Sequence, residues 1–334
     1  MRSAVIAGAG VHLPPKLVTN EDLCARLDTS DEWIRSRTGM SVRHVVEPGG
    51  ATSDLAVEAG RRALESAGGG ADLVVLATTT PDHQVPPTAP DITHRLGLGT
   101  IPSFDLSAAC AGFLYGLSTV AALIATGTAD RVLLIGADAF TTMVDPDDRG
   151  TVVLFGDAAG ALLLRAGEAD EPGALGKVVL GSDGSLAGLI QVPAGGSRSR
   201  SAGPVTKLAD PAEAYFKMNG RETFRHAVQR MSQASRAAVA AAGWSLDDVD
   251  RLCAHQANAR ILSAVADELG LFEDRQLSNI AEVGNTAAAS LPTLLAMSAA
   301  DGTLKPGHRV LLTAFGGGLS WGAATLTWPD VEVG

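Results

Sequence analysis

The stretch FDLSAACAGFLYGLSTVAALIATG, residues 104–127, decides the fold, because it joins a short strand, a turn with a cysteine and an apolar helix. The apolar residues after the turn recur at helical spacing: Phe113, Leu114, Leu117, Val120, Ala121 and Ile124. Small residues on the other face predict a central helix that is buried all round. Cys110 lies in the first turn, where free amide N–H groups and the helix dipole stabilise a thiolate. We therefore predict that Cys110 is a nucleophile.

The chain repeats its own pattern. RVLLIGADAF at 131–140 is followed by VLFGDAAGALLL, and RVLLTAFGGG at 309–318 is followed by LSWGAATLTW. Strand-like runs alternate with alanine-rich helical stretches, as is typical of mostly parallel sheets buried by helices on both faces. We infer an α/β fold of two duplicated halves, 1–170 with the cysteine and 171–334, with the site at their junction.

Composition excludes several classes of function. The 334 residues carry 26 Lys and Arg against 37 Asp and Glu, a net charge of −11, so no nucleic-acid partner is expected. The three cysteines, Cys24, Cys110 and Cys253, are far apart, which argues against disulfides and zinc and favours the reducing cytoplasm. No run reaches the roughly 20 apolar residues of a membrane span.

Two polar residues are candidate partners of the cysteine. In CAHQANARI, residues 253–261, His255 directly follows a predicted strand. In EVGNTAAASLPTLLA, residues 282–296, Asn285 lies on a glycine turn before another small-residue helix. Because both positions repeat the strand, turn and helix context of Cys110, we predict that His255 and Asn285 join it in one catalytic site.

At these residues the chain resembles the β-ketoacyl-acyl carrier protein synthase III family of the thiolase superfamily, from about residue 3 to 328. The resemblance rests on DEWIRSRTG (31–39), AACAGF (108–113), DRGTVVLFGDAAGA (148–161), PAGGSR (193–198), HQAN (255–258), GNTAAAS (284–290) and AFGGGLSWG (314–322). It implies a thiolase-like fold of two αβαβα halves, a homodimer, and an acyltransferase that needs no metal and no cofactor beyond its acyl-CoA substrate.

The resemblance also implies a reaction. Cys110 takes an acyl group from acyl-CoA, and malonyl-acyl carrier protein then loses CO₂ to give an enolate that attacks the acyl-cysteine. His255 and Asn285 donate hydrogen bonds to the malonyl thioester oxygen. The backbone N–H groups of Cys110 and Gly317 form the oxyanion hole for acyl transfer, and Phe315 shields the malonyl carboxylate. The product initiates a fatty acid or polyketide chain.

Further residues receive binding roles from the same resemblance. Trp33 and Arg149 sandwich the adenine of CoA, while Arg37 approaches its phosphates. The pantetheine channel is lined by Thr29, Gly220, Phe224, Ala257 and Asn258. Arg225 and Arg260 contact the acidic carrier protein. Phe140, and Val85 from across the dimer interface, border the acyl pocket and change its shape, so the primer is not fixed as acetyl.

One alternative stays open: an acyltransferase that uses the acyl-cysteine to form an ester or an amide, for which Asn285 is the discriminator. A papain-like hydrolase has the same Cys, His, Asn order, but AACAGF does not match its motif. A thiolase would need a second cysteine near the last glycine loop, which AFGGGLSWG lacks. A dinucleotide-binding fingerprint fails at GAGVHLP, where the third glycine is missing.

Overall fold

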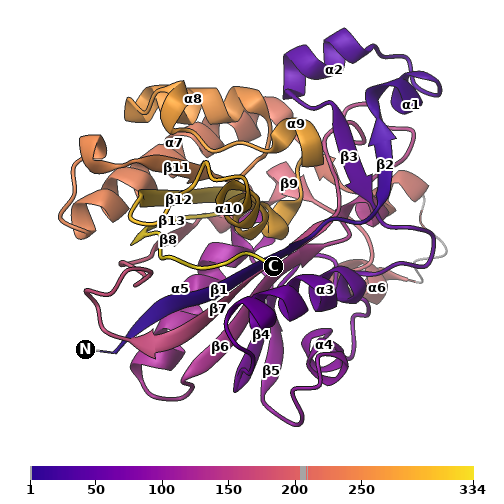
Figure 1. Ribbon diagram of the computed structural model, residues 1–334. Helices are drawn as coiled ribbons and strands as arrows, with labels where there is room; N and C mark the ends of the chain where they lie inside the picture. The colour runs from indigo at the N-terminus through magenta and orange to yellow at the C-terminus, as the bar shows by residue number, and fades with distance from the viewer. Residues whose placement is uncertain (1, 204–207, 209) are drawn as a thin grey trace.

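The computed structural model describes residues 2–203, 208 and 210–334, and it contains two main sheets (Figure 1). The first sheet has the strand order β1-β7-β6-β4-β5. Its strands are β1 Ser3–His12, β7 Ala158–Gly167, β6 Arg131–Asp138, β4 Leu73–Ala77 and β5 Ser103–Leu106. Only β7 runs against the other strands, so the sheet is mostly parallel, as the sequence predicts.

The second sheet has the order β11-β12-β13-β8. Its strands are β11 Arg251–Ala254, β12 Arg309–Gly316, β13 Ser320–Thr327 and β8 Val179–Ser182, and only β13 opposes the rest. The repeated segments occupy equivalent places, since β6 pairs with β7 as β12 pairs with β13, both antiparallel. Each sheet takes its strands from one predicted half, while the boundary at 170/171 stays a prediction.

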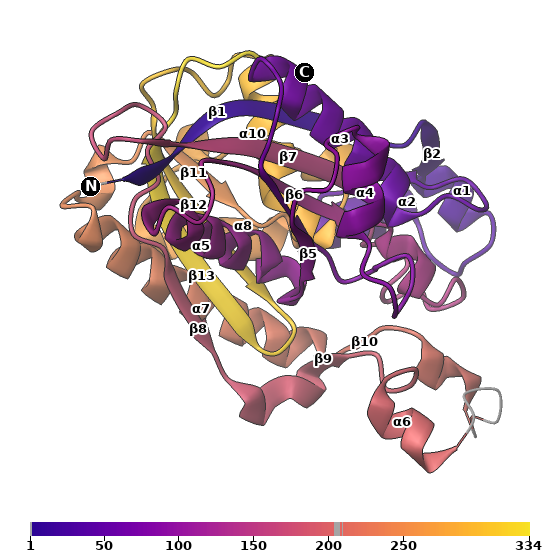
Figure 2. The same ribbon diagram turned by 90° about the horizontal axis from the view of Figure 1, so that it is seen from below.

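Helices form three layers around the two sheets (Figure 2). The middle layer is α5 Gly112–Ala125 and α10 Ser290–Ala300, each in contact with both sheets. The outer layers are α3 Thr52–Ser66 and α4 Ala89–Arg95 on the first sheet, and α7 Gly220–Ala241 on the second, with α8 Ala259–Leu269 packed against α7. Phe113, Leu114 and Leu117 of α5 are fully buried. The α5 helix is therefore central, as its apolar pattern predicts, but it is not buried all round, because Ala122 and Ala125 near its end are exposed.

Two smaller units flank the layers. One consists of the hairpin β2 Lys16–Thr19 and β3 Val42–Val45 with α1 Asn20–Cys24 and α2 Asp31–Thr38, and α9 Ile280–Val283 packs against β3. Ser30 begins α2 by accepting a hydrogen bond from the Trp33 N–H, and Gly39 ends it in the left-handed conformation. The other unit carries β9 Ile190–Gln191, β10 Lys217–Met218 and α6 Ser197–Ala202 and projects from the body (Figure 2).

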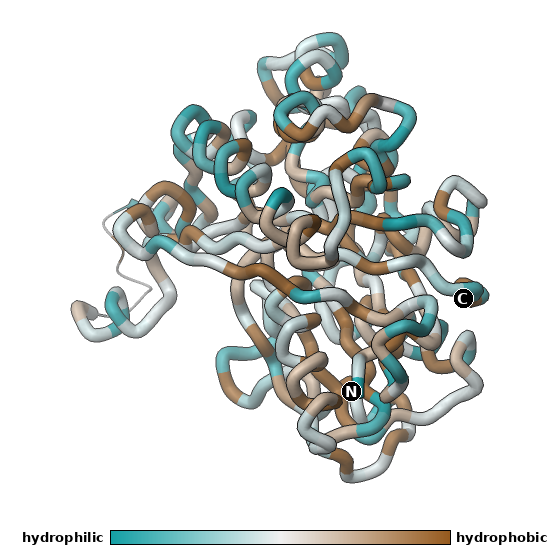
Figure 3. Tube along the Cα trace, turned by 90° about the vertical axis from the view of Figure 1, so that its left-hand side faces the viewer, coloured by the Kyte–Doolittle hydropathy of each residue, from teal (hydrophilic) through white to brown (hydrophobic). Residues whose placement is uncertain are grey.

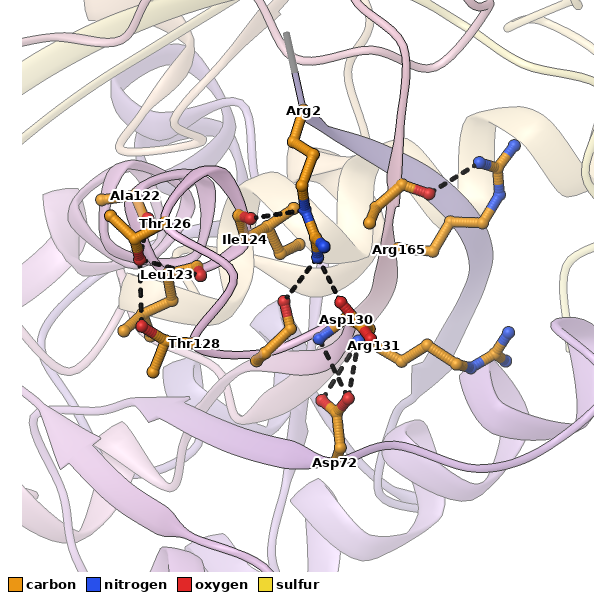
Figure 4. A network of polar contacts seen from close by, with 12 residues as sticks. Arg2, Asp72, Ala122, Leu123, Ile124, Thr126, Thr128, Asp130, Arg131 and Arg165 are labelled. Carbon is orange, nitrogen blue, oxygen red and sulfur yellow. Dashed lines mark hydrogen bonds and ion pairs between the residues drawn. The ribbon is translucent and has the colours of Figure 1, made fainter.

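Apolar segments run through the interior and hydrophilic residues cover the outer helix turns (Figure 3). At the amino end of β6 a polar network fixes the start of the chain (Figure 4). There Arg2 donates to the Ile124 carbonyl at 3.0 Å and to the Asp130 carboxylate, and Asp72 accepts from the Arg131 N–H at 3.1 Å. None of the helices in the described ranges is long and apolar enough to cross a membrane.

Candidate active site

Cys110 lies on a single helical turn, Ala109–Ala111, that leads into α5. Ala109 adopts a left-handed φ of 47°, which costs a residue other than glycine of the order of 1 kcal/mol. An equivalent turn, Ala287–Ala289, leads into α10, and there Ala287 has a φ of 48°. The duplication therefore extends to the two strained turns, of which only one carries a cysteine.

The last residues of β12 and β6 make different contacts with these two turns. A Cβ atom at Gly316 would lie 2.6 Å from the Cys110 nitrogen and 3.1 Å from the Ala111 nitrogen, so glycine leaves both amides uncovered. Aligning the repeated segments places Asp138 opposite Gly316. The fully buried Asp138 carboxylate accepts the Ala288 N–H at 2.8 Å and thus covers the equivalent amide of the second turn.

The Cys110 thiol is protonated in the resting protein. Burial, and secondarily the charge of Asp138, raise its pKa to about 12, while a hydrogen bond from its own backbone acts in the opposite direction. The start of the helix therefore does not give the resting thiolate that the sequence analysis expects, because desolvation of the sulfur outweighs it. The thiol proton must leave during the attack.

His255 follows β11 and is 2% exposed, with its backbone N–H donating to the Thr313 carbonyl at 2.8 Å. Burial lowers the pKa of His255 to about 4, so its imidazole is neutral at physiological pH. Its buried Nδ1 has no hydrogen-bond partner among the described residues. Since an unpaired acceptor costs less than an unpaired N–H, the proton belongs on Nε2, which leaves that nitrogen a donor.

Asn285 is fixed from both sides by the segment before β7. Its N–H donates to the Leu154 carbonyl at 2.8 Å, and its carbonyl accepts from the Gly156 N–H at 3.0 Å. The side-chain Oδ1 accepts the Ala287 N–H at 3.0 Å. Because the oxygen is engaged with the turn, the NH₂ group of Asn285 is the part available as a donor.

A single cavity of about 420 Å³ brings the predicted catalytic residues together. Cys110, His255, Asn285 and Phe315 all line it, and most of the lining is apolar. The same cavity includes further predicted residues: Arg37, Gly220, Phe224, Ala257, Asn258 and Arg260. A neutral donor pair beside a thiol in an apolar cavity can stabilise an oxyanion without water competing for it.

Two aromatic rings form one wall of this cavity, and a third packs against them. Phe155 and Phe216 line it, and Phe140 packs behind them, with its ring centroid 4.3 Å from that of Phe155 and 5.3 Å from that of Phe216. Of these three aromatic residues, only Phe140 is expected near the acyl pocket from the sequence. Phe155 and Phe216 were missed, because an aromatic residue in an apolar run carries no signal that distinguishes a cavity wall from the core.

The Arg149 guanidinium lies over the Trp33 ring, 5.8 Å from the ring centroid. Trp33 is 37% exposed, which leaves the ring accessible. Thr29 does not line the main cavity and lies instead in a separate hollow beside α1 and α2. These residues come from loops and from α2, far in sequence from the cysteine.

Three further predicted residues also lie outside the main cavity. Val85 is 85% exposed in the loop after β4. Arg225 pairs with Glu222 at 2.8 Å and borders a neighbouring hollow on α7. Gly316 lines the cavity while Gly317 does not, and a Cβ at Gly317 would meet Ile190 at 3.2 Å.

Titratable residues do not gather into a metal site in the part of the chain that the structure describes. No group of three or more His, Cys, Asp or Glu side chains there is placed to hold an ion. Cys24, Cys110 and Cys253 are all free thiols.

Two family models match the chain. The model described as 3-oxoacyl-[acyl-carrier-protein (ACP)] synthase III matches residues 104–184, and the model of the C terminal part of that synthase matches residues 239–328. A Streptomyces coelicolor protein named beta-ketoacyl-[acyl-carrier-protein] synthase III 3 is 55% identical over 99% of both chains. A synthase III from Pseudomonas aeruginosa is 49% identical over 99% of this chain and 98% of its own.

Solved structures agree with this assignment. The crystal structure of the Pseudomonas aeruginosa synthase III has a TM-score of 0.92 at 47% identity, covering 98% of this chain and 99% of the other. The priming β-ketosynthase of the R1128 polyketide pathway has a TM-score of 0.90 at 35% identity, covering 98% and 97%. These matches confirm the resemblance, the thiolase-like fold class and the acyltransferase class expected from the motifs. The chain belongs to the β-ketoacyl-[acyl-carrier-protein] synthase III family.

Proposed function

We propose that the protein condenses an acyl-CoA primer with malonyl-acyl carrier protein through an acyl-Cys110 intermediate, releasing CO₂ and initiating a fatty acid or polyketide chain. The observation that carries the proposal is the shared apolar cavity of Cys110, His255 and Asn285, with the Asn285 oxygen held by Ala287. The family membership supports the same reaction, since the relatives are named for it.

In the first half-reaction the Cys110 sulfur attacks the thioester carbon of acyl-CoA. The S–C bond to Cys110 forms as the bond to the CoA sulfur breaks, and the thiol proton leaves with CoA. The oxyanion is stabilised by the backbone N–H groups of Cys110 and Gly317. The bare Gly316 beside the Cys110 nitrogen supports this role for the first of the two donors. The reaction needs no metal or further cofactor, because Cys110 itself carries the acyl group.

In the second half-reaction the malonyl thioester occupies the same cavity. Breaking its bond to the carboxylate releases CO₂ and leaves an enolate, whose oxygen accepts hydrogen bonds from His255 Nε2 and Asn285 Nδ2. The enolate carbon attacks acyl-Cys110, the β-ketoacyl carrier thioester departs, and the cysteine sulfur takes up a proton. Phe315, which is 4% exposed, keeps water away from the carboxylate.

The entrance binds the two carriers. Trp33 and Arg149 hold the adenine and Arg37 the phosphates of CoA, and Thr29 contacts the arm outside the cavity. Gly220, Phe224, Ala257 and Asn258 line the pantetheine channel. Arg225 and Arg260 receive the acidic carrier protein. Their position on the α7 and α8 layer beside the cavity supports this assignment.

The working unit is a homodimer in the cytoplasm. The edge strand β5 pairs only with β4 in the first sheet, and the exposed Val85 lies in the loop after β4. Pairing of two β5 edges would cover them and let Val85 of one copy border the acyl pocket of the other. The three free cysteines fit a reducing compartment. A monomer by sedimentation at micromolar concentration would contradict the dimer.

The experiment is intact-protein mass after incubation with a panel of acyl-CoAs, followed by malonyl-acyl carrier protein. Wild type should gain the acyl mass on Cys110 and lose it with release of CO₂, whereas Cys110→Ala should gain none. Asn285→Ala should acylate normally and condense about 10²- to 10³-fold more slowly, because one oxyanion donor is removed. An adduct that persists with the malonyl carrier and discharges to an alcohol or amine would favour ester or amide formation.

A further inference from the structure

A buried arginine, Arg43 on β3, has a role in neither half-reaction as described so far. Its side chain is 1% exposed. Nε donates to the Val153 carbonyl at 3.0 Å, Nη2 donates to the same oxygen, and Nη1 donates to Asn20 Oδ1. No carboxylate of the described residues forms an ion pair with it. A buried cation without a direct counter-ion is costly, so what Arg43 contributes is its set of hydrogen bonds.

The carbonyl that Arg43 holds begins the segment that fixes Asn285. Val153 precedes Leu154 and Gly156, whose backbone groups bind the backbone of Asn285 at 2.8 and 3.0 Å. Gly284, with a φ of 69°, packs closely between Leu154 and Arg43. A Cβ at Gly284 would lie 3.0 Å from the Leu154 oxygen and 3.2 Å from Arg43 Cγ. The Asn285 loop therefore rests on Arg43 twice, through Val153 and through Gly284.

The other end of the guanidinium is also anchored. Asn20, which is 2% exposed, donates from its amide to Asp31 Oδ1 at 2.7 Å and to the Met40 carbonyl at 2.9 Å. Its remaining oxygen is therefore turned toward Arg43. The arginine is thus held between the α2 unit and the segment that carries Asn285, and its fork cannot rotate freely.

We propose that Arg43 is a positioning residue for the condensation step, because its guanidinium holds segment 153–156 and thereby places the Asn285 amide at the enolate oxygen. This inference rests on the proposed function. Cys110 stands on a separate support, the Ala109–Ala111 turn against the end of β12. Loss of Arg43 should therefore slow condensation much more than acylation of Cys110.

The test compares the two half-reactions in Arg43→Met and Arg43→Lys. Acylation by acyl-CoA is followed by rapid-quench mass spectrometry, and condensation by adding malonyl-acyl carrier protein to the pre-acylated enzyme. Since a shift of about 1 Å can cost about 10²-fold, Arg43→Met should lose 30- to 100-fold in condensation while acylation changes by less than about fivefold. Arg43→Lys keeps one donor for Val153 and should fall between wild type and Met.

Ile92→Ala is the control for general loss of stability. Ile92 is fully buried on α4, on the outer face of the first sheet, and its cluster contains none of the site residues. It should lower the melting temperature and leave the ratio of the two half-reactions as in wild type.

The outcomes separate the two claims. Equal losses of rate in both half-reactions would overturn the role of Arg43 and leave the proposed function standing. If Arg43→Met does not fold, an unchanged ratio of condensation to acylation rate in Arg43→Lys would do the same. A wild-type enzyme that acylates but does not condense would overturn the proposed function itself, and the Arg43 role with it.

Discussion

Burial of His255 makes a quantitative prediction about stability and pH. Its pKa falls from 6.5 to about 4 in the folded chain, because the 2% exposed ring is desolvated. The unfolded chain therefore binds a proton at His255 in a pH range where the folded chain does not. Stability is unaffected by this group above pH 6.5, declines as the pH falls from 6.5 to 4, and declines no further below that. At about 1.4 kcal/mol per unit, the full loss is about 3 kcal/mol, and about 2 kcal/mol is lost by about pH 5.

The perturbation is His255→Asn together with His255→Ala. Neither replacement titrates, so both should lack this part of the pH dependence even though their absolute stabilities differ. Urea unfolding at pH 8 and pH 5 gives the free energy of unfolding of each protein. The loss from pH 8 to pH 5 should be about 2 kcal/mol greater in wild type than in either variant. A difference below about 0.5 kcal/mol, or different values for the two variants, would refute the reasoning that burial holds His255 neutral.

Three further predictions concern the cysteine, the adenine site and the aromatic wall. Burial raises the pKa of Cys110 to about 12. Its alkylation by iodoacetamide should therefore accelerate about tenfold per pH unit between pH 6 and 9. A plateau in rate within that range would contradict a protonated resting thiol. Trp33→Ala should raise the KM for acyl-CoA about fivefold with kcat unchanged, while Trp244→Ala, whose ring stacks on a different arginine away from the cavity, should leave KM as it is. Phe140→Leu should lower the free energy of unfolding by about 1–2 kcal/mol and shift the acylation profile toward longer primers; an unchanged chain-length profile would show that Phe140 does not limit the pocket.

Much of the fold follows from local patterns in the sequence. The helix after Cys110, the repeated strands 131–138 and 309–316 and the turns before α5 and α10 are all visible as periodicity and repetition. The association of Cys110, His255 and Asn285 could also be predicted, since each follows a similar local pattern and duplicated halves bring such loops together.

Other features depend on contacts between segments far apart in the chain. The support of Asn285 by Arg43 joins residues 43, 153 and 285, and nothing in the sequence near Arg43 distinguishes it from a surface arginine. The protonation state of Cys110 depends on how completely its sulfur is buried, which a helix start alone does not fix. The wall of Phe155 and Phe216 depends likewise on tertiary packing.

The two left-handed turns, at Ala109 and Ala287, explain how only one half of a duplicated chain keeps an active site. After a duplication both copies have the same turn, and an active site in each would compete for the single space between the halves. In one copy the amide of the turn is already engaged, because the Ala288 N–H donates a hydrogen bond to the Asp138 carboxylate. The other copy is open because Gly316 has no side chain.

The closed copy is thus a template for switching off the open one. A carboxylate introduced by Gly316→Asp would be directed at the amides of Cys110 and Ala111, as Asp138 is directed at that of Ala288. Because the new Cβ would lie 2.6 Å from the Cys110 nitrogen, the turn that carries the cysteine would also have to shift. One half is therefore catalytic and the other structural because β12 ends in Gly316, without a side chain, whereas β6 ends in Asp138.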